Sequence, residues 1–186
     1  MAELYRFFAS GEGDEREYNQ EHWAEVIKGL SGNGIITAVD DRLEVIADEP
    51  ASMDVIVKTG AAWLEGYWYR NASPKAITLQ DADSNQPRID RIILRLDVYG
   101  ERKIEAVRKT GTPASAPSPP GLEQTSDYWE FPLANISVGA GVTSITDANI
   151  TDKREFVAQV RRIVLSTEDP EEAPGMEGDV WIKHEE

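Results

Sequence analysis

One segment, residues 89–109 (IDRIILRLDVYGERKIEAVRK), constrains the fold of this chain more than any other. Apolar and charged side chains alternate along it, which is the pattern of a strand with one buried and one exposed face. Tyr99, Gly100 and Glu101 interrupt the alternation with turn-forming residues. We therefore predict a long antiparallel hairpin with its bend at these three residues.

The first strand of this hairpin, RIDRIILRLD (residues 88–97), carries charges inside an apolar run. Positions 92, 94, 96 and 98 are all apolar and share one face, whereas Arg91 and Arg95 lie on the other. Guanidinium groups so placed can meet carboxylates of neighbouring strands or of an adjacent subunit. We interpret the segment as a central strand with one dry face and one face of ion pairs.

Asp90 and Asp97 are the most tempting acid–base pair for an enzyme. Glycosidase chemistry needs two carboxyl groups about 5–10 Å apart across a cleft. Seven residues along one strand place Asp90 and Asp97 on opposite faces and roughly 23 Å apart. The sequence therefore offers no catalytic constellation, and we expect a protein that is not an enzyme and needs no cofactor.

Further segments repeat the strand pattern. Residues 43–47 and 53–57 alternate apolar and polar side chains, and residues 61–71 form two short strands around a Glu65–Gly66 turn. Residues 128–138 resume the pattern, and residues 142–152 predict another short strand with an Asp-Ala-Asn turn. The fold class is therefore mainly β, an antiparallel β-sandwich with one short N-terminal amphipathic helix and an extended C-terminal arm.

The aromatic cluster in residues 63–69 has two interpretations. Alternation puts Trp63, Tyr67 and Tyr69 on one face and Trp68 on the other, and aromatic faces of this kind can stack on sugars. Packing in the core or at an interface is the favoured interpretation, with sugar binding kept as the alternative.

The N-terminal helix is predicted after residue 19. Asn19 is a good N-cap, and Trp23, Val26, Ile27 and Leu30 recur at helical spacing, so this stripe should pack on the body of the protein. Before it, the apolar segment LYRFF (residues 4–8) suggests a strand or a docking peptide.

Domain organisation depends on two irregular regions. Residues 111–121 (GTPASAPSPPG) carry four prolines, which predicts an extended loop, and we favour a loop within one domain. We predict a β-rich domain at 1–155 and a C-terminal arm at 156–186 for oligomerisation or partner docking. Residues 156–166 fit either a helix or a strand, and GDVWI suggests a short strand near the C-terminus.

Composition narrows the function. The chain has no cysteine and only two histidines, His22 and His184, which we expect to be surface residues without a special role. Its net charge of −15 opposes binding to nucleic acid. No apolar run approaches the roughly 20 residues that span a bilayer, and no secretion signal is apparent.

One metal motif deserves a test. Asp81, Asp83 and Asn85 match the opening of a calcium loop. Gln86 then stands in place of the turn glycine, and Ile92 in place of the twelfth-position glutamate. We interpret this segment as a polar turn between strands, and expect no metal.

Three runs, in order, resemble a known family: VKTGAAWLEGYWY, RIDRIILRLD and GTPASAPSPP. Over about residues 4–155 the chain resembles the N-terminal region of tail and baseplate structural proteins of phages that infect Gram-positive bacteria, described as upper baseplate proteins or tail-fibre adaptors. The resemblance implies a virion component, made in the host cytoplasm, that links the tail to fibres or receptor-binding proteins without catalysis.

The implied partners are other tail and baseplate proteins, receptor-binding proteins and further copies of the chain, with a trimer favoured. The alternative is a carbohydrate-binding module that recognises host cell-wall polysaccharide through Trp63, Trp68 or Trp129. Six residues are candidates for the interfaces: Tyr5, Phe7, Phe8, Arg91, Arg95 and Trp181.

Overall fold

β-strands are the predominant regular structure, as the sequence predicts, in a computed structural model that describes residues 10–12, 15, 17–157, 163–166 and 180–183. In chain order the elements are α1 (Gln20–Leu30), β1 (Gly34–Ile36), β2 (Val45–Ala47), β3 (Asp54–Val57), β4 (Gly60–Leu64), β5 (Tyr67–Asn71), β6 (Lys75–Thr78), β7 (Arg88–Asp97), β8 (Lys103–Lys109), β9 (Tyr128–Val138), the 3-10 turn η1 (Asp147–Asn149), β10 (Ile150–Asp152), β11 (Phe156–Val157), β12 (Ile163–Ser166) and β13 (Val180–Lys183).

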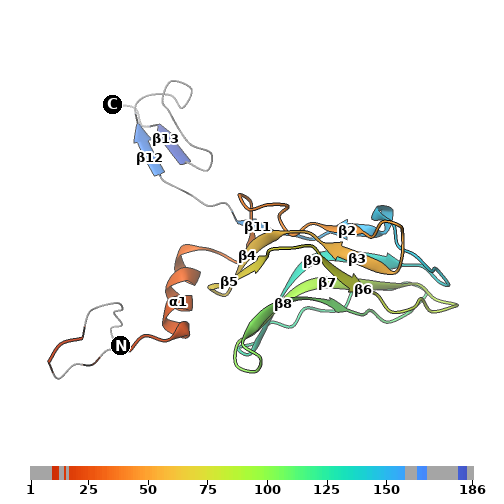
Figure 1. Cartoon of the computed structure of the whole chain (residues 1–186), viewed down its shortest axis with the longest axis horizontal. Helices are drawn as coiled ribbons and strands as arrows, with labels where there is room; N and C mark the ends of the chain where they lie inside the picture. The colour runs from red at the N-terminus through yellow and green to blue at the C-terminus, as the bar shows by residue number, and fades with distance from the viewer. Residues whose placement is uncertain (1–9, 13–14, 16, 158–162, 167–179, 184–186) are drawn as a thin grey trace.

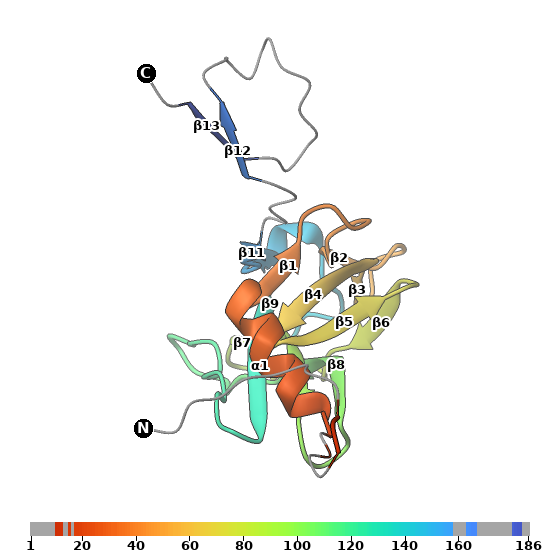
Figure 2. The ribbon, with the colours of Figure 1, turned by 90° about the vertical axis from the view of Figure 1, so that its left-hand side faces the viewer.

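The strands build a two-layered sandwich. One layer is a single sheet, and the other layer consists of two sheets. The undivided layer has the order β10-β9-β7-β8. The other layer consists of β11-β1-β4-β5 and β2-β3-β6, which lie over different parts of it (Figure 1). Figure 2 shows α1 across one end of this arrangement. β7 is the central strand that the sequence predicts, because β8 pairs with one of its edges and β9 with the other.

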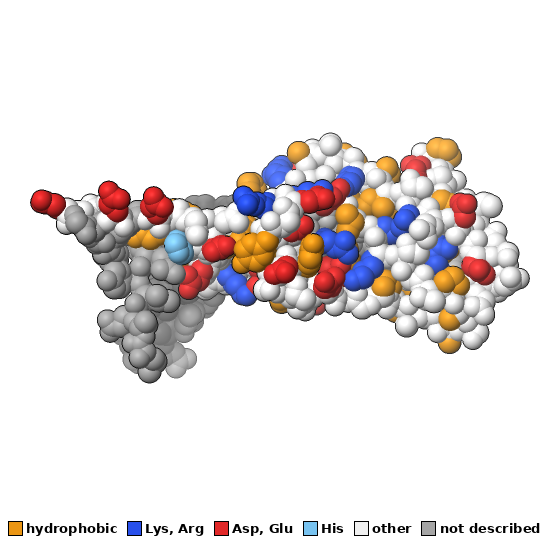
Figure 3. All heavy atoms as spheres, turned by 90° about the horizontal axis from the view of Figure 1, so that it is seen from below, with side chains coloured by type: hydrophobic (Ala, Val, Ile, Leu, Met, Phe, Trp, Pro, Cys, Tyr) orange, Lys and Arg blue, Asp and Glu red, His pale blue; other side chains and the backbone are white. Residues whose placement is uncertain are grey.

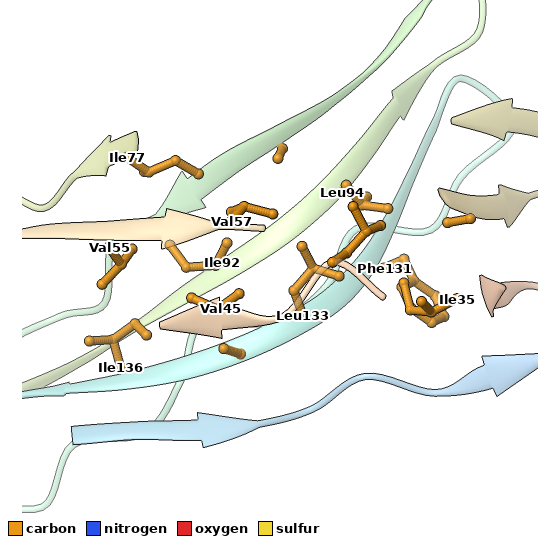
Figure 4. Close-up of a cluster of buried hydrophobic side chains, with 14 of the residues drawn as sticks. Ile35, Val45, Val55, Val57, Ile77, Ile92, Leu94, Phe131, Leu133 and Ile136 are labelled. Carbon is orange, nitrogen blue, oxygen red and sulfur yellow. The ribbon is translucent and has the colours of Figure 1, made fainter. Parts of the chain in front are cut away.

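The core fills the space between the layers, and all three sheets contribute to it (Figure 4). Most of its completely buried side chains are β-branched or leucine residues at alternate positions of a strand, which is what two packed sheets require. They include Ile35, Val55, Val57, Leu64, Ile92, Leu94, Leu133 and Ile136. Burial of this apolar surface is the main stabilising contribution to such a fold.

The predicted hairpins are confirmed. β7 pairs antiparallel with β8 from Arg91 opposite Lys109 to Asp97 opposite Lys103. β4 pairs with β5 around the Glu65–Gly66 turn. Because β9 returns to the sheet of β7 and β8, the proline-rich segment is a loop within one domain, as favoured from the sequence.

Helix α1 has the predicted cap but does not bury its apolar stripe. The Asn19 side chain accepts hydrogen bonds from the backbone N–H groups of Glu21 and His22. His22 has a role that we did not expect, since its Nδ1 accepts from the Asn19 backbone N–H at 3.2 Å. Trp23 is 55% exposed and Leu30 80% exposed.

The expectation that the helix stripe packs on the body is therefore wrong for Trp23 and Leu30. The helix contacts the sandwich through Ala24, which is buried, rather than through its most apolar line of side chains. Val26 and Ile27 are half-buried. The short helix thus presents a large part of its apolar surface outward.

Where the structure describes residues 156–166, they form strands and not a helix. Phe156 and Val157 form β11, which runs parallel to β1, so the sandwich continues two residues beyond the boundary predicted at residue 155. Residues 163–166 form β12, which pairs parallel with β13 and confirms the strand expected in GDVWI. The predicted arm otherwise includes residues 158–162, 167–179 and 184–186, among them His184, which lie outside the described residues.

Candidate interaction surface

Large exposed apolar side chains gather at one end of the sandwich. This aromatic end, as we call it, consists of Trp23, Leu30, Trp68, Tyr99, Tyr128 and Phe156. They come from α1, β5, the β7–β8 turn, β9 and β11, whose ends lie at the side of the molecule where α1 stands (Figure 1). These six are the exposed large hydrophobics found among the described residues. Such a concentration is typical of a surface that binds another macromolecule.

Tight backbone contact holds α1 against this end. Gly66, in the β4–β5 turn, has φ +83°, and a Cβ at this position would lie 2.0 Å from the Ala24 carbonyl oxygen. The Asn33 side chain donates to Glu65 Oε1 at 2.6 Å and accepts from the Glu65 backbone N–H at 2.6 Å. Lys28 forms an ion pair with the other oxygen of Glu65. The helix is therefore fixed to the β4–β5 turn at several points.

An open groove of about 310 Å³ separates α1 from the strands beside it. Its apolar lining comes from α1, β5, β7, the β7–β8 turn and β9, and it includes Ala24, Tyr67, Leu96, Val98 and Trp129. Carboxylates of Glu21, Glu25 and Glu65 stand at its rim. The pKa of Tyr67 is raised, mainly by burial and to a smaller extent by the negative charge of Glu21. The groove combines an apolar floor with an acidic edge.

Trp63 and Trp68 lie side by side on one face, which corrects the predicted arrangement. They are direct cross-strand partners, with ring centroids 6.3 Å apart and ring planes inclined by 34°. Simple alternation through Glu65 and Gly66 predicts opposite faces, but these two residues form the turn, so Leu64 pairs with Tyr67 and Trp63 with Trp68. Tyr67 and Tyr69 do share a face, toward the core. Trp68 is 57% exposed and is not a core residue.

Arg91 and Arg95 make their polar contacts within the chain. Arg91 Nε donates to the Asn135 side-chain oxygen at 3.0 Å, so its partner is an amide and not a carboxylate. Arg95 donates from Nε and Nη2 to Glu130 Oε1, at 3.1 and 2.6 Å. Figure 3 shows the mixture of acidic and basic side chains on this side of the molecule. The predicted face of ion pairs is thus present at Arg95.

Glu130 is completely buried although it lies on the outer side of the sheet. Lys109 and the Glu123 backbone N–H reach its Oε2 at 2.6 and 2.7 Å. Burial raises the pKa of Glu130, but the hydrogen bonds from Lys109, the Glu123 N–H and Arg95 outweigh it, and the pKa falls below the ordinary value. The end of the proline-rich loop is thereby tied to the sheet.

A second buried pair, Arg88 with Asp90, lies at the other end of β7. Arg88 Nε donates to Asp90 Oδ1 at 2.9 Å, and the Gly111 N–H donates to the same oxygen at 2.9 Å. Arg88 also donates to the backbone carbonyls of Gln80 and Asp81. This pair therefore holds two loops to the central strand. The sequence analysis considers Asp90 as a possible catalytic acid and does not identify Arg88 as its partner. The position of Arg88 at the start of the strand, two residues from Asp90 on the same face, could have indicated the pair.

The other acidic candidates have local structural partners. Asp97 accepts from the backbone N–H groups of Gly100 and Glu101 and so closes the β7–β8 turn. Asp83 Oδ1 accepts from the N–H groups of Asn85 and Gln86, at 2.8 Å each, which makes the 81–87 segment a polar turn. Among the described residues, no cluster of three or more histidine, cysteine, aspartate or glutamate side chains is arranged to hold a metal ion.

The side chains of the other four interface candidates lie outside the described part of the chain. Tyr5, Phe7 and Phe8 lie outside the described residues. Trp181 is in β13 opposite Val164 of β12, but its side chain is also outside what the structure describes.

In the described part of the chain, no helix has the length and hydrophobicity to cross a membrane. No protein-family model, curated protein or solved structure matches the chain significantly.

Proposed function

We propose that this protein is a structural component of a phage tail tip or baseplate, an adaptor that links the tail to fibres or receptor-binding proteins. The observation that carries the proposal is the aromatic end, where six large apolar side chains gather on one side of a β-sandwich. The resemblance of residues 4–155 to phage tail and baseplate proteins supports the same assignment.

The energetics of α1 support assembly. An isolated helix of eleven residues is marginal in water, and such helices depend on packing of their apolar face. Here the sandwich covers Ala24 while Leu30 remains exposed. Burial of the aromatic end against neighbouring subunits, in a homo-oligomer with a trimer favoured, would supply the missing contact.

Two measurements test this function. Multi-angle light scattering of the purified full chain should give a mass of at least twice 20.7 kDa. A reconstruction of intact particles should place the chain in the tail or baseplate. A monomeric chain that is absent from the tail would refute the proposal.

The Trp63–Trp68 pair supports a second candidate, a carbohydrate-binding module for host cell-wall polysaccharide. Two neighbouring indole rings, of which that of Trp68 is 57% exposed, are suited to stacking on sugar rings. Saturable binding of wall polysaccharide that is lost in Trp68→Ala would support this candidate. Absence of binding on a glycan array, or unchanged binding by the variant, would remove it.

A further inference from the structure

We propose that the groove between α1 and β7 receives the aromatic segment Leu4–Phe8 of a second copy of this chain. The proposal rests on the oligomeric assembly proposed above and specifies one contact within it. The partner is therefore an identical chain, and the ligand is a short apolar peptide with one cation.

The shape and lining of the groove suit aromatic side chains. Its volume of about 310 Å³ is at the lower end of the roughly 300–1,000 Å³ typical of protein pockets. Leu96, Val98 and Trp129 give it an apolar floor. The segment LYRFF supplies three aromatic rings in five residues, and such rings bury much apolar area at a small cost in side-chain entropy.

Charge complementarity fixes the kind of peptide. Glu21, Glu25 and Glu65 line the rim, and only Lys28 among the groove residues is basic, where it is paired with Glu65. The segment Leu4–Phe8 contains one charged residue, Arg6, and no acidic one. A guanidinium group beside Glu21 would gain charge-assisted hydrogen bonds at the edge of an apolar site.

The direction of the chain before α1 favours a neighbouring copy over the same chain. Figure 1 shows the described residues 10–12 farther from the sandwich than α1 itself. Eleven residues separate Phe8 from Gln20, and an extended stretch of this length spans up to roughly 40 Å. The segment can therefore reach an adjacent subunit.

Disulfide trapping can test this contact directly, because the chain contains no cysteine. Phe7→Cys in one full-length chain and Tyr99→Cys in a second, differently tagged chain would be co-expressed and oxidised. Tyr99 lines the groove and is exposed. We expect a covalent heterodimer at a yield at least about tenfold above that of a control pair, since docking raises the effective concentration of the two thiols.

The control pair replaces Tyr99→Cys with Ser84→Cys. Ser84 is also exposed, but it belongs to the connection between β6 and β7, which Figure 1 shows at the end of the sandwich away from α1. In addition, Arg6→Glu should weaken association by about tenfold, the effect of roughly 1.4 kcal/mol. Combination with Glu21→Arg should restore it.

The outcomes separate this contact from the assembly itself. A wild-type oligomer without the heterodimer, or without rescue by the charge exchange, would overturn the groove contact and leave the assembly intact. A crosslink formed only inside a chain that carries both cysteines would show that the segment binds its own groove. A monomeric wild-type chain would overturn both proposals together.

Discussion

Glu130 on β9 and Arg95 directly opposite on β7 form a two-pronged contact in which both guanidinium donors reach one carboxylate oxygen. Lys109 on β8 approaches the second oxygen, and so does the backbone of the proline-rich loop at Glu123. One carboxylate therefore joins three strands and the loop that crosses outside them.

Removal of this carboxylate should destabilise the protein. Glu130→Gln leaves Arg95 and Lys109 without their anion, and hydrogen bonds to charged groups contribute roughly 1.5–3 kcal/mol. Because Arg95 is 39% exposed and can recover water, we expect a loss of about 2 kcal/mol rather than the roughly 3–5 kcal/mol of a fully buried pair. Urea unfolding would measure it. Glu123→Gln is the control, because only its backbone is used; an equal loss in both variants would contradict this role.

The stability of the protein should fall in acid. The folded-state pKa of Glu130 lies below its ordinary value of 4.5, so its contribution is complete above that value and is lost as the pH falls through the folded-state pKa. Thermal unfolding between pH 7 and pH 2 should show this decline, and Glu130→Gln should reduce its slope. Asp83 and Asp97 also have lowered pKa values, so the variant should retain part of the decline. Parallel curves for the two proteins would argue against Glu130 as a source.

Gly66→Ala should loosen α1 from the sandwich. The added methyl group would collide with the Ala24 carbonyl, and the positive φ disfavours any side chain. We expect a loss of more than about 1 kcal/mol in the free energy of unfolding. Gly121→Ala is a matched control, since a Cβ there has no atom within 4 Å. Equal effects of the two substitutions would refute the close approach of helix and turn.

The two charged positions at the start of β7 should differ. Arg88→Met strips a buried carboxylate, Asp90, of its ion pair, and breaking such a pair costs roughly 3–5 kcal/mol. Arg91→Ala removes one side-chain hydrogen bond to Asn135 and should cost about 1 kcal/mol. Chemical denaturation of both variants checks the order. A larger effect of Arg91→Ala would mean that its main partner lies in another subunit.

Substitution of a buried leucine and of an exposed leucine should affect the stability of the fold and the association of subunits differently. Leu94→Ala opens a cavity in the core and should cost roughly 2–5 kcal/mol. Leu30→Ala touches a side chain that is largely exposed, so monomer stability should change by less than about 0.5 kcal/mol. Under the proposed assembly, Leu30→Ala should nevertheless raise the dissociation constant in light scattering at decreasing concentration. An unchanged dissociation constant would remove Leu30 from the interface.

The strands were predictable because their signal is local. The hairpin bend near Gly100 and the Glu65–Gly66 turn follow from alternation and turn residues, and both appear where expected. The central position of β7 was also predictable, because the arginines on its second face can meet carboxylates of neighbouring strands. The domain boundary was less predictable. The sandwich continues past residue 155 because β11 pairs with β1, more than a hundred residues earlier in the chain.

The features of the surface depended on packing that sequence periodicity does not contain. A helical stripe shows that apolar residues share a side, but not whether that side meets the body, and here Ala24 makes the contact. The facing of Trp63 and Trp68 depended on how the turn sets the register. The burial of Glu130 depended on a loop crossing a face that alternation alone assigns to solvent. That Arg95 forms an ion pair was predictable, but the identity of its partner, Glu130, was not.

The parallel pairing of β1 with β11 has a mechanical consequence. β1 begins just after helix α1, and β11 is the first part of the predicted C-terminal arm, with Ile35 opposite Phe156 and Ile36 opposite Val157. The Ile35 N–H also donates to the Glu155 carbonyl at 2.8 Å. Because the two strands are parallel, a force that pulls on the chain before β1 and on the chain after β11 acts at opposite ends of the pair and draws the strands in opposite directions. It loads these hydrogen bonds together in shear, whereas peeling from an edge would break them one after another.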